Sequence, residues 1–177
     1  MKLLRAITTV GGFTMLSRIF GFIRDVLIAA IIGAGGIADA FFVAFRFPNL
    51  FRRLFAEGAF AAAFVPIFSS ILEQEGREKA RAFAEQAFTL LFLILALFVS
   101  AFEIIMPWAM MVLAPGFDEV PKKMEMATEL SRIAFPYLLF ISLVSLQSGV
   151  LNSLGRFAVP AAAPVLFNLV LISAILG

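Results

Sequence analysis

The sequence predicts an all-α bundle of helices that crosses a membrane several times. Of its 177 residues, 62% are hydrophobic and only 15% are charged, whereas soluble domains have about 45–50% and about 25%. The apolar residues also form long continuous runs, unlike barrel strands, which alternate over about 9–11 residues. A polytopic transmembrane helix bundle is therefore the expected fold class.

The composition also excludes several functional classes. The chain has no Cys and no His, so it lacks the ligands of a disulfide framework or a Cys/His zinc module. Cys–His and Ser–His–Asp catalysis are excluded for the same reason. We expect no metal, no cofactor, no catalytic residue and no nucleic-acid partner.

Five apolar runs are long enough to cross a hydrocarbon core roughly 30 Å thick, which takes about 20 helical residues. They cover residues 6–32, 37–68, 82–106, 126–151 and 157–177. The breaks are a glycine-rich turn at 33–36, polar segments at 73–81 and 114–123, and a short turn at 152–156. Glu75 and Lys79 have i,i+4 spacing, so we expect a solvated helix at 73–81. The last run is still apolar where the sequence stops, which predicts a portion of a longer protein.

Basic residues near the ends of the runs predict the orientation, because cytoplasmic loops carry an excess of Lys and Arg. With the N-terminus inside, the inner side carries Lys2, Arg5, Arg77, Lys79, Arg81 and Arg156, and the outer side carries Lys122 and Lys123. We therefore expect a multi-pass protein with a cytoplasmic N-terminus.

Other basic residues lie where a bilayer penalises charge. Arg18, Arg24, Arg46, Arg52, Arg53 and Arg132 fall inside predicted spans or at their ends. A central Arg costs about 2.5–3.5 kcal/mol on insertion scales, whereas a good apolar residue returns only about 0.3–0.6 kcal/mol. Such charge typically marks a functional site that faces a bundle interior or an aqueous cavity. Arg53 and Arg132 could instead snorkel to the lipid headgroups from span ends.

Helical spacing groups these charges. At about 100° per residue, the first span places its polar residues on a stripe about 120° wide, formed by Thr14, Ser17, Arg18, Gly21, Arg24 and Asp25. In the second span, Asp39, Arg46, Asn49, Arg53 and Glu57 share a face. Pro48 lacks an N–H and kinks the helix there, so the spacing does not decide between Arg52 and Arg53.

Arginines clustered inside a membrane predict an anionic ligand. The guanidinium is always charged and donates bidentate hydrogen bonds that match phosphate oxygens. A low-dielectric cavity strengthens the attraction, so a phosphate or diphosphate is the expected ligand. Asp25, Asp39 and Glu57 would then hold the arginine side chains or form gates. Arg–Asp pairs, such as Arg24 with Asp25 or Asp39, can also simply join helices.

Several motifs resemble the N-terminal region of the MurJ/MviN lipid II flippases. The similar segments are Ser17–Asp25, Gly33–Gly35, Ala38–Leu50, Arg52–Phe60, Ala63–Pro66, Ala114–Phe117, Phe135–Tyr137 and Leu151–Ser153. The resemblance runs the length of the chain and is most specific between Ser17 and Pro66.

The resemblance implies a fold and a function. These flippases belong to the multidrug/oligosaccharidyl-lipid/polysaccharide exporter superfamily and have two lobes, of which this chain would supply part of the N-terminal one. They move lipid II, the undecaprenyl-diphosphate-linked peptidoglycan precursor, from the inner to the outer leaflet of the bacterial cytoplasmic membrane by alternating access. Besides membrane lipids, the expected partners are lipid II and the C-terminal lobe of the same protein.

The resemblance also implies roles for particular residues. It assigns substrate binding to Arg18, Arg24 and Arg52, and so favours Arg52 over Arg53 as the cavity-facing residue. It assigns cavity or gating positions to Ser17, Asp25, Asp39, Arg46, Asn49, Arg53 and Glu57.

Three other functions stay open at this point. The chain could belong to a flippase for another polyprenyl-diphosphate glycan, such as an O-antigen unit. It could be part of a membrane enzyme acting on such lipids, although the sequence shows no nucleophile–base pair and no metal-binding carboxylate cluster. It could also be a portion that is inactive on its own.

Overall fold

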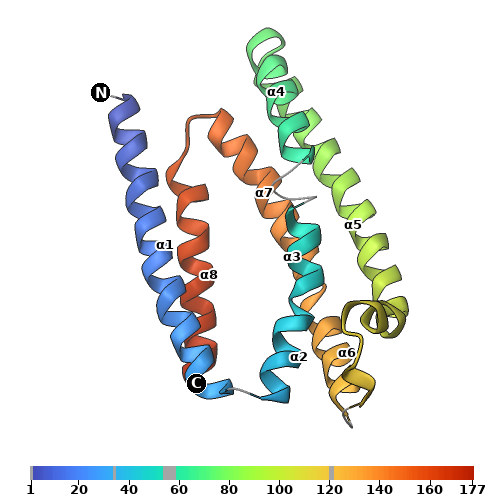
Figure 1. Ribbon diagram of the computed structural model, residues 1–177. Coiled ribbons are helices and arrows are strands. Elements are labelled where there is room, and N and C mark those ends of the chain that lie inside the picture. Colours follow the sequence, from blue (N-terminus) through green and yellow to red (C-terminus); the bar gives the residue numbers. More distant parts are fainter. Residues whose placement is uncertain (1, 34, 54–58, 120–121) are drawn as a thin grey trace. The chain divides into compact units, whose positions relative to one another are not determined.

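The structure, a computed structural model, describes residues 2–33, 35–53, 59–119 and 122–177 (Figure 1). Its elements are α1 (Lys2–Ile32), α2 (Gly36–Ala44), α3 (Arg46–Arg52), α4 (Ala59–Gln74), α5 (Arg77–Leu113), a short 3-10 helix η2 (Phe117–Glu119), α6 (Lys123–Ala134), α7 (Tyr137–Ser153) and α8 (Ala158–Leu176). These described ranges contain no strand. The predicted all-α fold class is confirmed.

Long apolar helices confirm the membrane character of the chain. Within the described residues, three segments are long and apolar enough to cross a membrane: Arg77–Leu113, Lys123–Ser153 and Ala158–Leu176. The number of spans, expected to be five, stays a prediction.

The chain divides into two compact units, one formed by residues 1–34 and 151–177 and the other by residues 35–150. In the first unit, α1 packs along α8. Figure 1 shows these two helices side by side and running in the same direction. Most apolar side chains of α1 are exposed, as expected of a surface that meets lipid or other protein.

The second unit has a hydrophobic core between its helices. Within it, α2 and α5 pack on α6, and α4 packs on α5. Leu95, Met106, Met110, Phe135 and Leu138 are fully buried. The ring of Phe135 lies against that of Phe102, with centroids 4.8 Å apart. Part of the large phenylalanine content therefore builds this core.

The second apolar run is not one helix. It contains α2, α3 and the first part of α4, with residues 54–58 outside the described ranges. The predicted disruption near Pro48 is present, but the break lies at Phe45 and Pro48 sits in the first turn of α3. The first N–H groups of a helix have no intrahelical partner, so a proline is tolerated there. Pro48 therefore helps to begin a new helix instead of kinking a continuous one.

The fourth apolar run, predicted as a single span, lies within the one candidate span Lys123–Ser153, whose helix is interrupted at residues 135 and 136. Helix α6 ends at Ala134 and α7 begins at Tyr137. Pro136 lies between them and has no N–H to continue the hydrogen-bond ladder. The chain turns here, and the Leu138 N–H donates to the Phe135 carbonyl at 3.0 Å.

The polar segment at 73–81 is mostly helical, as predicted. The turn between α4 and α5 is confined to Glu75 and Gly76, and Gly76 has a positive φ of 88°. The predicted pair of Glu75 with Lys79 is confirmed, with the ammonium 2.7 Å from the carboxylate.

Candidate functional site

The predicted site residues are distributed over both units. Helix α1 of the first unit carries Ser17, Arg18, Arg24 and Asp25. The second unit carries Asp39 on α2, with Arg46, Asn49 and Arg52 on α3 and Arg53 directly after it. Glu57 lies outside the described residues. That these residues line one cavity stays a prediction.

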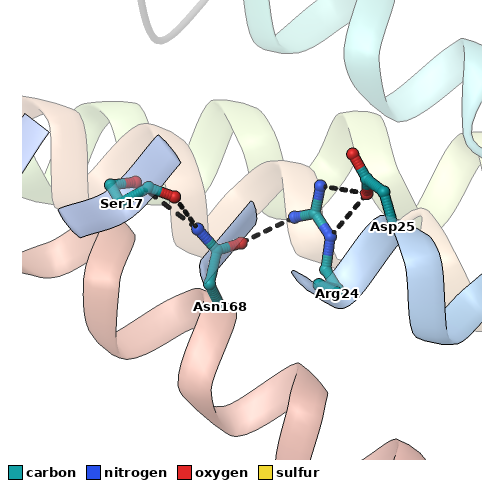
Figure 2. Close-up of polar contacts among 4 residues, drawn as sticks. All are labelled: Ser17, Arg24, Asp25 and Asn168. Carbon is teal, nitrogen blue, oxygen red and sulfur yellow. Dashed lines mark hydrogen bonds and ion pairs between the residues drawn. The ribbon is translucent and has the colours of Figure 1, made fainter. Parts of the chain in front are cut away.

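The first unit holds Arg24 in a network of polar contacts (Figure 2). Its Nε and Nη2 donate to Oδ1 of Asp25 at 3.0 and 2.7 Å. Its Nη1 donates to Oδ1 of Asn168 on α8 at 2.7 Å. The Arg24 side chain is 24% exposed and that of Asp25 is 66% exposed. Of the two Arg–Asp pairings that the sequence allowed for Arg24, the structure forms the one with Asp25.

Asn168 links the Arg24 guanidinium to the backbone of α1. Its Nδ2 donates to the Ser17 carbonyl at 3.0 Å and lies 3.4 Å from the Ser17 hydroxyl oxygen. Asn168 itself is 6% exposed. The two ends of its amide are not interchangeable here, because the oxygen faces a donor and the nitrogen faces an acceptor.

The polar stripe predicted on α1 is divided by this contact. Ser17, Gly21 and Arg24 follow the i, i+4, i+7 spacing of one helical face, and that edge meets Asn168. An added Cβ on Gly21 would lie 3.5 Å from Asn168 Nδ2. Arg18 and Asp25, on the other edge, are exposed. One edge of the stripe therefore packs against α8, and the other is open.

The Arg24 network leaves hydrogen-bonding capacity unused. A guanidinium has five N–H donors. The contacts within the described residues use Nε–H, one N–H of Nη1 and one N–H of Nη2. One N–H therefore remains on each terminal nitrogen. Each of these two donors can form a charge-assisted hydrogen bond with a phosphate oxygen.

Sequence reasoning missed Asn168. It lies within the last apolar run, whose other side chains are hydrophobic apart from Ser173. An amide at the middle of a spanning helix needs a partner, because the hydrocarbon core offers no water. That requirement was the available signal, but it does not identify the partner.

Asp39 pairs with a residue that the sequence placed in a loop. Its Oδ2 accepts a hydrogen bond from the Lys123 ammonium at 2.8 Å, which joins α2 to α6. The Lys123 side chain is only 16% exposed, and its ammonium lies 4.2 Å from the centre of the Phe117 ring. Cation–π attraction therefore adds to the ion pair.

A pocket of about 410 Å³ adjoins this pair in the second unit. Asp39 and Arg46 supply its charged walls, and Phe42, Val43, Leu113 and Phe117 are among its apolar ones. Arg46 and Asn49 are exposed. At the end of α3, Arg52 is half-buried and Arg53 is exposed, so the two neighbours differ in environment.

Comparison with known proteins identifies the family. A family model described as lipid II flippase MurJ matches residues 28–176. The chain belongs to this family. The MurJ family model thus covers the described helices from the end of α1 to α8.

Curated MurJ relatives match nearly the whole chain. The probable lipid II flippase MurJ of Rhizobium tropici is 49% identical over 99% of the chain, which is 33% of the relative's length. The lipid II flippase MurJ of Burkholderia cenocepacia is 45% identical over 98% of the chain and 34% of its own length. The probable lipid II flippase MurJ of Vibrio cholerae is 39% identical over 97% and 34%. The chain spans about a third of the length of the curated relatives it matches.

Proposed function

We propose that this chain is part of the N-terminal lobe of a lipid II flippase in the bacterial cytoplasmic membrane. Its role is that of a transporter and not of an enzyme. Membership of the MurJ family and the long apolar helices support this proposal. The names of the relatives give the substrate as lipid II, which is an anionic lipid with a diphosphate.

Arg18, Arg24 and Arg52 bind the diphosphate in this proposal. The observation that carries it is the Arg24 network, which orients the guanidinium and leaves one N–H on each terminal nitrogen. Charge-assisted bidentate bonds to phosphate are among the strongest hydrogen bonds that proteins form. The lipid tail stays in the bilayer while the arginines attract the headgroup from the cytoplasmic side. Rocking of the two lobes then exposes the headgroup to the outer side.

The test uses a hybrid in which residues 1–177 replace the matching third of the Rhizobium tropici relative. Arg18→Ala, Arg24→Ala and Arg52→Ala each lower lipid II translocation about tenfold or more, because a hydrogen bond to a charged group is worth about 1.5–3 kcal/mol. Translocation is measured in vesicles, and function by rescue of flippase-depleted cells.

Arg77→Ala is the matched control, because it removes the same charge from an exposed position at the start of α5. It leaves translocation unchanged. If all three spanning-arginine variants keep full translocation, the site assignment is wrong. If the unsubstituted hybrid moves another polyprenyl-diphosphate glycan in place of lipid II, the substrate assignment is wrong.

A further inference from the structure

We propose that Asn168 is a positioning residue, which holds the Arg24 guanidinium in the orientation that binds the diphosphate. This inference rests on the proposed function, because it assumes that Arg24 contacts the substrate. It adds a residue on α8 to a site that the sequence placed on the first two spans.

The geometry explains why an amide suits this position. Its oxygen accepts from Arg24 Nη1 at 2.7 Å, and its nitrogen donates to the Ser17 carbonyl at 3.0 Å. A side chain with both a donor and an acceptor is required to join these two groups. A carboxylate would satisfy Arg24 but could not donate to the carbonyl.

Burial makes the orientation specific. Asn168 is 6% exposed and lies directly against α1 at Gly21, where no side chain intervenes. The amide is held at both ends. Asn168 accepts from one terminal nitrogen of Arg24, and Asp25 accepts from the other. The guanidinium plane is therefore restrained from two sides, and ordering it before the ligand arrives lowers the entropic cost of binding.

The electrostatics distinguish the two supporting residues. Asp25 opposes the Arg24 charge, whereas the neutral Asn168 restrains Arg24 and leaves its positive charge intact. Asn168 therefore supports anion binding without weakening the attraction. Among the described residues its side chain hydrogen-bonds to Arg24 and Ser17, so its contribution to binding acts through Arg24.

The experiment is a double-mutant cycle in the same hybrid, reconstituted in nanodiscs. The affinity for undecaprenyl diphosphate, which carries the diphosphate without sugars, is measured for the unsubstituted hybrid, Asn168→Leu, Arg24→Ala and the double variant. Asn168→Leu lowers the affinity about tenfold, the lower end of what loss of the hydrogen-bond partner of a metal ligand costs at metal sites. In the Arg24→Ala background, Asn168→Leu has no further effect.

Two further variants test whether the effect is specific to the contact between Asn168 and Arg24. Ser173→Ala removes from α8 a hydroxyl that donates to the Leu169 carbonyl of its own helix, and it leaves the affinity unchanged. Asn168→Ala repeats the cycle with a smaller side chain if Asn168→Leu does not fold, and thermal unfolding of every variant is measured alongside.

The outcomes separate the two proposals. If Asn168→Leu lowers the affinity by the same factor with and without Arg24, Asn168 acts independently of Arg24 and the positioning role is wrong. The role is also wrong if Arg24→Ala weakens binding but neither Asn168 variant does. If Arg24→Ala itself leaves binding and translocation unchanged, the diphosphate-binding role of Arg24 fails, and with it the basis of this inference.

Discussion

At the scale of single residues, the contact between Gly21 and Asn168 shows how a small residue supports a polar one. Gly21 has no Cβ, so the Asn168 amide lies against the backbone of α1 between Ser17 and Arg24. The space beside Gly21 is limited, since an added Cβ would lie 3.5 Å from Asn168 Nδ2, which is ordinary van der Waals contact. The position is therefore expected to accept a methyl group and to reject anything larger.

Gly21→Ala and Gly21→Leu test this limit. Gly21→Ala keeps or raises stability, by up to about 1 kcal/mol, because alanine has the higher helix propensity. Gly21→Leu displaces Asn168, lowers the thermal stability and weakens diphosphate binding. Thermal unfolding and undecaprenyl diphosphate binding are the measurements. Equal behaviour of the two variants would show that Asn168 does not lie against this position.

At the scale of elements, helix packing depends on close approaches that the sequence does not display. Gly149 of α7 faces α4, where an added Cβ would lie 3.1 Å from Val65 Cγ2 and 3.8 Å from Phe64 Cδ1. The first distance is tighter than most Cβ contacts. Phe64 is buried at 4% exposure, and the Val65 side chain is β-branched and stiff, so neither side chain moves away freely.

Gly149→Ala is therefore expected to destabilise the second unit. Overpacking costs about 1–3 kcal/mol, which exceeds the gain of about 1 kcal/mol in helix propensity. Adding Val65→Ala to Gly149→Ala relieves the contact and recovers part of the loss. Thermal unfolding in detergent measures both changes.

The control for this prediction is Gly11→Ala in α1, where nothing lies within 4 Å of the added Cβ. It does not lower stability. If Gly149→Ala were as stable as Gly11→Ala, the close packing of α4 on α7 would be wrong.

At the scale of the whole molecule, one long helix predicts the orientation in the membrane. Helix α5 has 37 residues and is about 55 Å long at about 1.5 Å per residue, so it exceeds a hydrocarbon core of roughly 30 Å. Its first turns carry Arg77, Lys79 and Arg81, and Lys122 and Lys123 follow its other end. The excess of basic residues predicts that the first end lies in the cytoplasm.

Introduced cysteines test the orientation cleanly, because the chain has no Cys of its own. In the hybrid with any cysteines of the relative removed, Glu78→Cys reacts with a membrane-impermeant thiol reagent only from the cytoplasmic side. Glu125→Cys, at the start of α6, reacts only from the outer side. The unsubstituted parent gives no labelling. Reaction of both positions from the same side would overturn the predicted topology.

Particular elements show how much of the fold the sequence predicted. The runs at 6–32 and 157–177 became α1 and α8 because continuous apolar helices satisfy their own backbone hydrogen bonds. The run at 37–68 is divided at Phe45, whereas the run at 126–151 lies within the single candidate span Lys123–Ser153 and is interrupted only at residues 135 and 136. Composition locates an apolar run, but a proline does not by itself fix where a helix ends, because Pro66, Pro107 and Pro164 lie inside α4, α5 and α8.

The sequence by itself determined the helical membrane class, the family resemblance and the presence of arginines within apolar runs. These features depend on composition, periodicity and local motifs. The tertiary structure decided which groups those charges meet. Arg24 contacts Asn168, which lies 144 residues away, and Asp39 pairs with Lys123, 84 residues away. Hydrogen bonds over such separations depend on which helices pack together, and helical periodicity places side chains on a face without saying which helix covers it.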